Sequence, residues 1–264
     1  MDQVSSCLVS IITVCHNQLE GLKRTYQSVK DQWANDIEWL VIDGASNDGS
    51  QAWLAGCDYD KLRYLSEPFE QRYAAMNKGV SLARGTWVLF LNAGDCFCGK
   101  QVLRKVITLL QTELDIVAGH TIYFSRYGTR VCHARPLGQD GAGMPFFLTS
   151  TLIKRELLQR RPFDTRYGLA ADYELLHWAA SQQKVDLVVC FPIGLYDGRS
   201  DRSEREIVGR QREIRQILGR YEGFRNQLCW KGYLAKRALW SMGRWLLPHA
   251  VIRKRRELYY TTNC

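Results

Sequence analysis

Short apolar segments that alternate with stretches of helical periodicity constrain the fold of this chain more than any other feature. The apolar segments are rich in β-branched residues and lack a helical period, so they predict buried strands. The strands are expected at 8–15, 38–42, 62–66 and 86–91, and the helices between them at 16–33, 50–56 and 72–84. Strands that alternate with helices need right-handed crossovers, which predicts an α/β fold with a parallel sheet covered on both faces.

The carboxyl ends of these strands are the expected place for a ligand, because open parallel sheets bind ligands beyond that edge. Three turns lie there: Cys15–Asn17, Asp43–Asp48 and Asn92–Asp95. Carboxylates in such turns suit a hard divalent cation that neutralises a diphosphate. Taken alone, Asn92-Ala93-Gly94-Asp95 also has the composition of an ordinary turn.

Two common nucleotide-binding motifs are missing. The first turn reads CHNQLEG, which lacks both the GxGxxG of dinucleotide-binding proteins and a P-loop. A nucleotidyltransferase that makes activated sugars would need a Gly-rich, Lys-containing loop in the N-terminal region, and none is present. A catalytically silent binding or scaffold protein stays open as an alternative from another class.

The second half of the chain has a weaker pattern. It predicts a helix near 99–112, strands near 115–119 and 121–134, helices at 154–160 and 173–183, and a strand at 185–190. From residue 203 onward the chain reads as helical and charged. We expect one domain over 1–202, with a nucleotide-binding half near 8–98 and an acceptor half near 99–202, followed by a helical, basic extension over 203–264.

The cysteines and the absence of long apolar runs indicate a reducing compartment. The nine cysteines include no CxxC pair, which favours reduced thiols over a zinc site or disulfides. No run approaches the roughly 18 apolar residues that a membrane span needs, and MDQVSSC does not resemble a signal peptide. We therefore expect a cytoplasmic protein.

The net charge of +9 is concentrated in one segment. Residues 225–256 contain nine Lys and Arg and no acidic residue, and tryptophans lie among them. This composition favours the surface of an anionic membrane, to which each cation contributes about 1 kcal/mol. Packing against the catalytic domain is the alternative. Nucleic acid is not expected as a partner, because no DNA- or RNA-binding module is recognisable.

Five ordered motifs resemble a known family. VSIITVCHN, EWLVIDGASNDGS, RYLSEP, RYAAMNKGVSLARG and WVLFLNAGD together resemble the N-terminal half of family 2 glycosyltransferases, most closely the bacterial colanic-acid and exopolysaccharide type. The resemblance implies the GT-A fold, with a mostly parallel central sheet flanked by helices. It also implies inverting transfer of a sugar from a nucleotide-diphosphate donor to a saccharide in cell-surface polysaccharide biosynthesis. A lipid-linked acceptor would place the protein on the inner face of the cell membrane.

The resemblance assigns roles to matching positions. Asp95, with Asn92 in support, matches the motif that binds Mn2+ or Mg2+, and Asp172 in GLAADYELLHW matches the general base. Asp172 also stands where a helix N-cap is expected, and both roles can hold. The positions that match the donor site are Thr13, His16, Asn17, Asp43 and Asp48 on the nucleoside side, and Arg72, Asn77 and Lys78 in the motif near the diphosphate.

Three departures from the family pattern concern the acceptor side and the donor. Ala74 replaces an Asp, a His-Gln pair is missing at Leu148-Thr149, and a GGxS loop appears as residues 197–200, DGRS. The sugar, the nucleotide base and the linkage are not readable from the sequence, since selectivity depends on a few loop contacts.

Overall fold

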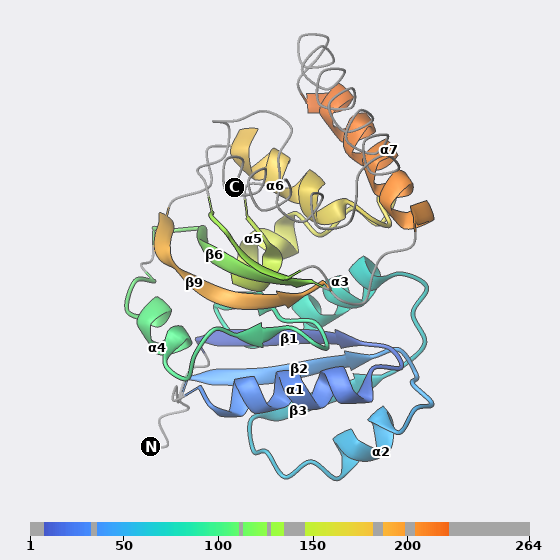
Figure 1. Ribbon diagram of the computed structural model, residues 1–264, viewed down its shortest axis with the longest axis vertical. Coiled ribbons are helices and arrows are strands. Elements are labelled where there is room, and N and C mark those ends of the chain that lie inside the picture. The colour runs from blue at the N-terminus through green and yellow to red at the C-terminus, as the bar shows by residue number, and fades with distance from the viewer. Residues whose placement is uncertain are drawn as a thin grey trace.

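The computed structural model describes residues 8–32, 36–110, 113–125, 128–134, 146–181, 187–198 and 204–221. Over these ranges helices pack against both faces of a central sheet (Figure 1). The strands are β1 (Val9–Cys15), β2 (Ile37–Asp43), β3 (Leu62–Ser66), β4 (Trp87–Phe90), β5 (Cys96–Phe97), β6 (Ile116–Ser125), β7 (Gly128–Cys132), β8 (Thr151–Lys154) and β9 (Leu187–Asp197). The α-helices are α1 (Leu19–Lys30), α2 (Ser50–Ala55), α3 (Arg72–Leu82), α4 (Val102–Ile107), α5 (Arg155–Arg160), α6 (Ala171–Ser181) and α7 (Glu204–Tyr221), with a 3₁₀ turn at Leu148–Ser150.

Strand β1 lies at the centre of the N-terminal half. It pairs in parallel with β2 on one side and with β4 on the other, and β3 adds to β2. The register sets Cys15 opposite Asp43 and Asp43 opposite Ser66, so the polar ends of these strands reach the same edge of the sheet. The predicted alternation and the parallel order of the first four strands are confirmed.

Both faces of the sheet are buried against helices. Leu22 and Val29 of α1 pack with Val9, Ile11 and Val41 on one face. On the other face, side chains of α3, α5 and α6 pack against the strands; they include Tyr73, Met76, Val80, Leu157, Leu158, Leu175 and Leu176. This two-sided burial explains why the strands read as continuous apolar runs in the sequence.

The C-terminal half of the sheet is mixed. Strand β8 runs antiparallel between β4 and β6, while β9 is parallel to β6 and antiparallel to β5. The short strands β5 and β8 lie outside the sequence-based predictions. Strand β9 extends seven residues beyond the predicted 185–190, to Asp197, and α4 is shorter than the predicted 99–112.

One backbone contact in this half is unusually close. A Cβ added at Gly194 of β9 would lie 2.3 Å from the carbonyl oxygen of Thr149. The hydroxyl of Ser150 accepts a hydrogen bond from the Gly194 N–H at 2.9 Å. Only glycine lets β9 approach the 148–150 turn this closely.

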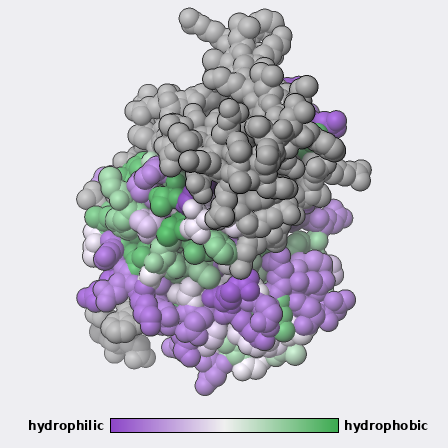
Figure 2. Space-filling model, in the orientation of Figure 1, coloured by the Kyte–Doolittle hydropathy of each residue, from purple (hydrophilic) through white to green (hydrophobic). Residues whose placement is uncertain are grey.

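Part of the surface is apolar. In Figure 2 apolar side chains gather on one side of the visible face; half-buried apolar residues of the α4 region and β9, among them Ile107, Leu109 and Phe191, pack at the edge of the core. The six cysteines that the structure describes are free thiols. In the same described part of the chain, no helix has the length and apolar character needed to cross a bilayer.

Candidate functional site

The turns after β1 and β2 are bound to each other. Asn17 has φ 50°, in the left-handed region, and its backbone N–H donates to Ser46 Oγ at 2.8 Å. Its side-chain Oδ1 accepts the Asn47 N–H at 2.8 Å. The His16 ring lies with Nδ1 2.9 Å from the carbonyl oxygen of Gly44, and it packs edge-on against Phe69. These predicted nucleoside-binding residues therefore form one cross-linked rim.

Asp43 lies beneath this rim and is fully buried. Its carboxylate accepts hydrogen bonds from the backbone N–H and the hydroxyl of Ser46, at 3.0 and 2.5 Å, and from the Ser66 hydroxyl at 2.6 Å. A buried carboxylate with several donors is a stable organising group. Asp43 thus shapes the turn that it begins and ties it to β3.

Asp48 joins two helices. One carboxylate oxygen accepts the Leu19 N–H at the start of α1, at 2.8 Å, and the other accepts the N–H and hydroxyl of Ser50 at the start of α2. Hydrogen bonding from the Ser50 hydroxyl is the main cause that lowers the pKa of Asp48. The residue predicted to contact the donor is therefore also an N-terminal cap.

Thr13 belongs to the interior. It is fully buried; its hydroxyl donates to the Leu91 carbonyl oxygen at 2.6 Å and accepts from Trp39 Nε1 at 2.8 Å. These bonds connect β1 with β2 and with the end of β4. The structure places the Thr13 side chain behind the nucleoside rim rather than on its surface.

Asp95 is a buried carboxylate at the end of β4. It is 4% exposed, its Oδ1 accepts the backbone N–H of Asp197 at 3.0 Å, and its Oδ2 accepts the Thr149 hydroxyl at 3.1 Å. Burial raises the pKa of Asp95 to about 7, against the effect of these hydrogen bonds, and the neighbouring Asp197 carboxylate adds to the rise. The site is therefore short of positive charge.

Thr25 of α1 holds the turn that carries Asp95. Its hydroxyl lies 3.0 Å from the donating N–H of Gly94, and 2.8 and 3.2 Å from the carbonyl oxygens of Asp95 and Asn92. Gly94 has φ 103°, a conformation that glycine adopts without strain. The 92–95 turn is thereby fixed against α1.

The Asp95 site fits a divalent cation. The Oδ1 atom of Asn92, in the same turn, is buried and has no hydrogen-bond partner within the described structure, so it is free to act as an oxygen ligand. Mg2+ and Mn2+ are commonly held by one or two protein oxygens together with substrate phosphates. Over the described residues no cluster of three or more acidic, His or Cys side chains is present that could hold a metal alone. A cation bound here would thus share its ligands with a phosphate group.

The three α3 residues predicted to lie near the diphosphate, Arg72, Asn77 and Lys78, have different surroundings. Arg72 stacks over the Tyr73 ring, its Nη2 donates to the Tyr73 hydroxyl at 3.1 Å, and its Nε is buried without a hydrogen-bond partner. Asn77 makes two hydrogen bonds of 2.9 Å with the backbone of Phe163. Lys78 is half-exposed and lies 3.5 Å from Glu67. Of these three residues, Arg72 is therefore the one with a buried hydrogen-bond donor that has no acceptor.

Asp172 lies in the first turn of α6 and pairs with α7. Its Oδ1 and Oδ2 accept Arg210 Nη1 and Nη2 at 3.0 and 3.2 Å, and Oδ1 also accepts the Tyr173 N–H at 2.9 Å. Burial opposes ionisation, but Arg210 and then Arg72 outweigh it and hold the pKa of Asp172 below its ordinary value. The carboxylate is consequently ionised at neutral pH.

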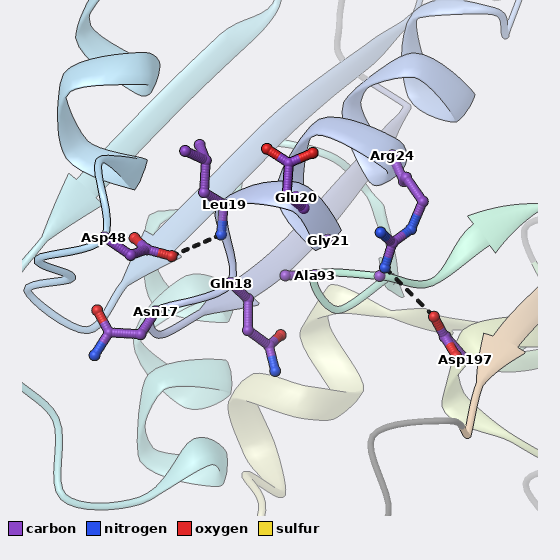
Figure 3. Close-up of a pocket in the computed structure, with 10 residues that line it drawn as sticks. Asn17, Gln18, Leu19, Glu20, Gly21, Arg24, Asp48, Ala93 and Asp197 are labelled. Carbon is purple, nitrogen blue, oxygen red and sulfur yellow. Dashed lines mark hydrogen bonds and ion pairs between the residues drawn. The ribbon is translucent and has the colours of Figure 1, made fainter. Parts of the chain in front are cut away.

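A cavity of about 470 Å³ opens beside the first turn of α1 (Figure 3). Arg24 reaches across it to Asp197, with Nη2 and Oδ2 3.4 Å apart, and Asp48 lies at its other side. The lining residues are Asn17, Gln18, Leu19, Glu20, Gly21, Arg24, Asp48, Ala93, Gly94 and Asp197. The cavity thus connects the rim formed by the turns after β1 and β2 with the turn that carries Asp95.

This arrangement agrees with a match to a family model. Residues 10–169, more than half of the chain, match the model described as glycosyl transferase family 2. The chain belongs to glycosyl transferase family 2. It is a nucleotide-sugar glycosyltransferase, as the five ordered motifs predict.

Curated relatives support this assignment. The chain is 30% identical over 203 residues to an uncharacterised glycosyltransferase of Mycobacterium tuberculosis, covering 72% of each chain. It is 27% identical over 184 residues to a PGL/p-HBAD biosynthesis glycosyltransferase of Mycobacterium bovis, covering 63% of this chain and 67% of that one. These relatives are mycobacterial, so they bear out the family and not the narrower likeness to colanic-acid enzymes.

Solved structures confirm the GT-A-like fold. S. aureus TarS residues 1–349 in complex with UDP align with a TM-score of 0.60 at 14% identity, over 81% of this chain and 66% of that one. A mannosyltransferase from Pyrobaculum calidifontis, in complex with GDP-Man and Mn2+, aligns with a TM-score of 0.61 at 17% identity. The alignment covers 80% of this chain and 63% of that one.

Sequence reasoning missed four residues that the structure adds to the candidate site. Thr149 and Asp197 both contact Asp95, Arg24 pairs with Asp197, and Arg210 pairs with Asp172. Thr149 and Asp197 fall at two of the departures from the family pattern. Their position there was a usable signal, whereas nothing in the sequence marked Arg24 or Arg210.

The cap formed by Asp48 leads to a first prediction. Asp48→Ala removes acceptors for α1 and α2 and should lower the free energy of unfolding by about 1–2 kcal/mol, measured by urea denaturation. Asp48→Asn keeps a capping oxygen and should lose less than half as much. Unchanged stability in Asp48→Ala would contradict the capping role.

Proposed function

We propose that this glycosyltransferase moves a sugar, with inversion, from a nucleotide-diphosphate donor to a hydroxyl of a lipid-linked saccharide. The acceptor belongs to cell-surface polysaccharide biosynthesis in bacteria, as in the exopolysaccharide enzymes that the motifs resemble. The observation that supports this most is the buried Asp95 carboxylate at the sheet edge, in the same turn as the unpartnered Asn92 Oδ1. Burial without a positive partner disfavours the ionised carboxylate, so this site favours the binding of a cation.

The donor is proposed to lie across the edge formed by the first three turns. Its nucleoside contacts the rim of His16 and Asn17, which Asp43 and Asp48 hold in place, with Thr13 supporting the rim from behind. Arg72, with its buried and unpartnered Nε, and Lys78 attract the diphosphate, and Asn77 fixes α3 against the Phe163 backbone. Solved relatives in fold carry UDP, UDP-GlcNAc or GDP-Man, which supports a donor of this class.

The proposed cation is Mn2+ or Mg2+, held by Asp95 with Asn92 in support. It would neutralise the charge that develops on the departing diphosphate. Thr149 and the Asp197 N–H orient the Asp95 carboxylate by occupying one position on each oxygen. The solved mannosyltransferase of similar fold contains Mn2+, which supports this choice of metal.

Asp172 is proposed as the general base. An ionised carboxylate can remove the proton of the acceptor hydroxyl as its oxygen attacks the anomeric carbon, while the diphosphate leaves from the opposite face. The low pKa of Asp172 keeps it in the required form. Asp172 is the second residue of α6 rather than its N-cap as expected, and the hydrogen bond from the Tyr173 N–H holds its carboxylate at the start of the helix.

Membrane association is proposed from the basic segment 225–256, which lies outside the described residues. The protein would bind the inner face of the cell membrane peripherally, where a lipid-linked acceptor lies. A curated relative acts, by its name, in PGL/p-HBAD biosynthesis.

The metal proposal predicts that UDP or GDP stabilises the protein more strongly with Mn2+ than without it. At about 100 times the Kd, a bound ligand stabilises the folded state by about 2.7 kcal/mol, which thermal unfolding detects readily. Asp95→Asn should lose the part of the shift that depends on Mn2+, whereas Asp58→Asn, at an exposed carboxylate, should keep it. If the Mn2+-dependent shift survives in Asp95→Asn, the metal site lies elsewhere.

The base proposal predicts that Asp172→Asn lowers kcat by about 10²–10⁴-fold, because the proton acceptor is lost. The assay measures release of nucleoside diphosphate. Its donor is the nucleotide sugar whose nucleotide stabilises the protein, and its acceptor is a lipid-linked saccharide. Nucleotide binding by the same variant should stay close to wild type. Equal turnover in Asp172→Asn would remove it as the base.

The membrane proposal predicts co-sedimentation with anionic vesicles and weaker binding as salt increases, since exposed charges are screened. Truncation after Gly223 should abolish binding, and replacing Arg253, Lys254, Arg255 and Arg256 by Gln should weaken it. Vesicles of neutral lipid are the control. Unchanged sedimentation after truncation would refute the proposal.

A further inference from the structure

Helix α7 holds the loop that carries Asp172. Leu169, three residues before Asp172, is bound at both of its backbone polar atoms: its N–H donates to Glu213 Oε2 at 2.9 Å, and its carbonyl oxygen accepts from Arg210 Nη1. The same guanidinium makes the two contacts to the Asp172 carboxylate. Arg210 thus joins the start of α6 and the preceding loop to one point on α7, which lies beyond the residues that match the family model.

Helix α7 packs against this loop through apolar side chains. Ile217 and Leu218 are buried against Ala170 and Tyr173, with Tyr167 and Ile214 at the margin. A Cβ added at Gly209 would lie 2.7 Å from Leu169 Cδ1, so α7 packs closely against the Leu169 side chain. In Figure 1 α7 lies beside α6. This packing fixes the position from which Arg210 reaches Asp172.

Three charged or titratable side chains face Asp172 from the elements packed around it. Arg210 comes from α7, and Arg72 and Tyr73 come from α3, where the buried Tyr73 ring lies under the Arg72 guanidinium. Glu213 on α7 is occupied by the Leu169 N–H. Burial alone would raise the pKa of Asp172, and the cations reverse that effect, with Arg210 the larger cause and Arg72 the smaller.

We propose that Arg210 is a positioning residue for catalysis, which keeps the Asp172 carboxylate ionised and fixed in orientation for the acceptor hydroxyl. The two contacts of the planar guanidinium leave the carboxylate little freedom to rotate. In this arrangement the charge of Asp172, at the start of α6, depends on a side chain of α7. The inference rests on the proposed role of Asp172 as general base.

Arg210→Gln tests this proposal through pH dependence, with Arg210→Lys as the conservative variant. Wild-type Asp172 has a depressed pKa, so its contribution to stability is present above the unfolded pKa and is lost only at acid pH. Without Arg210, burial should raise the pKa above the unfolded value, and the loss of stability should grow as the pH rises from the unfolded pKa of Asp172 through its raised folded pKa. Thermal unfolding across this range measures the effect without any acceptor. Arg212→Gln, at an exposed position on the same helix, is the matched control and should follow wild type.

Turnover supplies the second readout. In Arg210→Gln the acid limb of the kcat profile should move to higher pH by at least about one pH unit. At pH values below this limb kcat should fall about tenfold, and at higher pH it should recover. Arg210→Lys should give a smaller shift, and stabilisation by UDP or GDP should stay as in wild type. The stability effect should vanish in the double variant Asp172→Asn with Arg210→Gln.

The outcomes separate this inference from the proposed function. A loss in Arg210→Gln that is independent of pH in both stability and turnover would overturn the proposal, because it would show a structural role alone. If Asp172→Asn turns over normally, the proposed base is wrong and the catalytic role of Arg210 falls with it. The pH dependence of unfolding would still report whether the two residues are coupled.

Discussion

The parallel pairing of β1 with β2 and β4 is the constraint on which the rest of the structure depends. Because β1 is buried on both faces and paired on both edges, its position sets where three turns emerge. Hydrogen bonds then fix those turns to one another: Asn17 to Ser46 and Asn47, and Asp48 to the starts of α1 and α2. The apolar core decides where the turns meet, and the polar network decides their shape.

The carboxylates proposed as metal ligand and general base, Asp95 and Asp172, have opposite electrostatic surroundings. Asp95 receives hydrogen bonds from neutral donors and has another carboxylate nearby, so its environment favours a cation from outside. Asp172 already has a guanidinium from within the chain. The positive charge that balances Asp95 is therefore expected from a bound metal, whereas the positive charge that balances Asp172 comes from the protein itself.

The sequence was informative where local periodicity and strand order carry the structure. The predicted strands at 8–15, 38–42, 62–66 and 86–91 agree with β1 to β4 within one residue at each end. Strands β1, β2 and β4 are buried along their whole length, whereas the edge strand β3 is only partly buried. The partners of the carboxylates were not predictable in the same way. Thr149 and Asp197 lie 54 and 102 residues from Asp95, and they arrive through a short antiparallel strand and a bulged pairing of β6 with β9. Neither pairing has a local sequence signal.

The close approach at Gly194 has a consequence for what defines this site. The carbonyl that leaves no room for a methyl group on Gly194 belongs to Thr149, whose hydroxyl orients Asp95. The distance from β9 to the 148–150 turn, and with it the reach of that hydroxyl, is set by the absence of a side chain. A position without any functional group therefore helps to specify the chemistry, and an inventory of polar residues alone would overlook it.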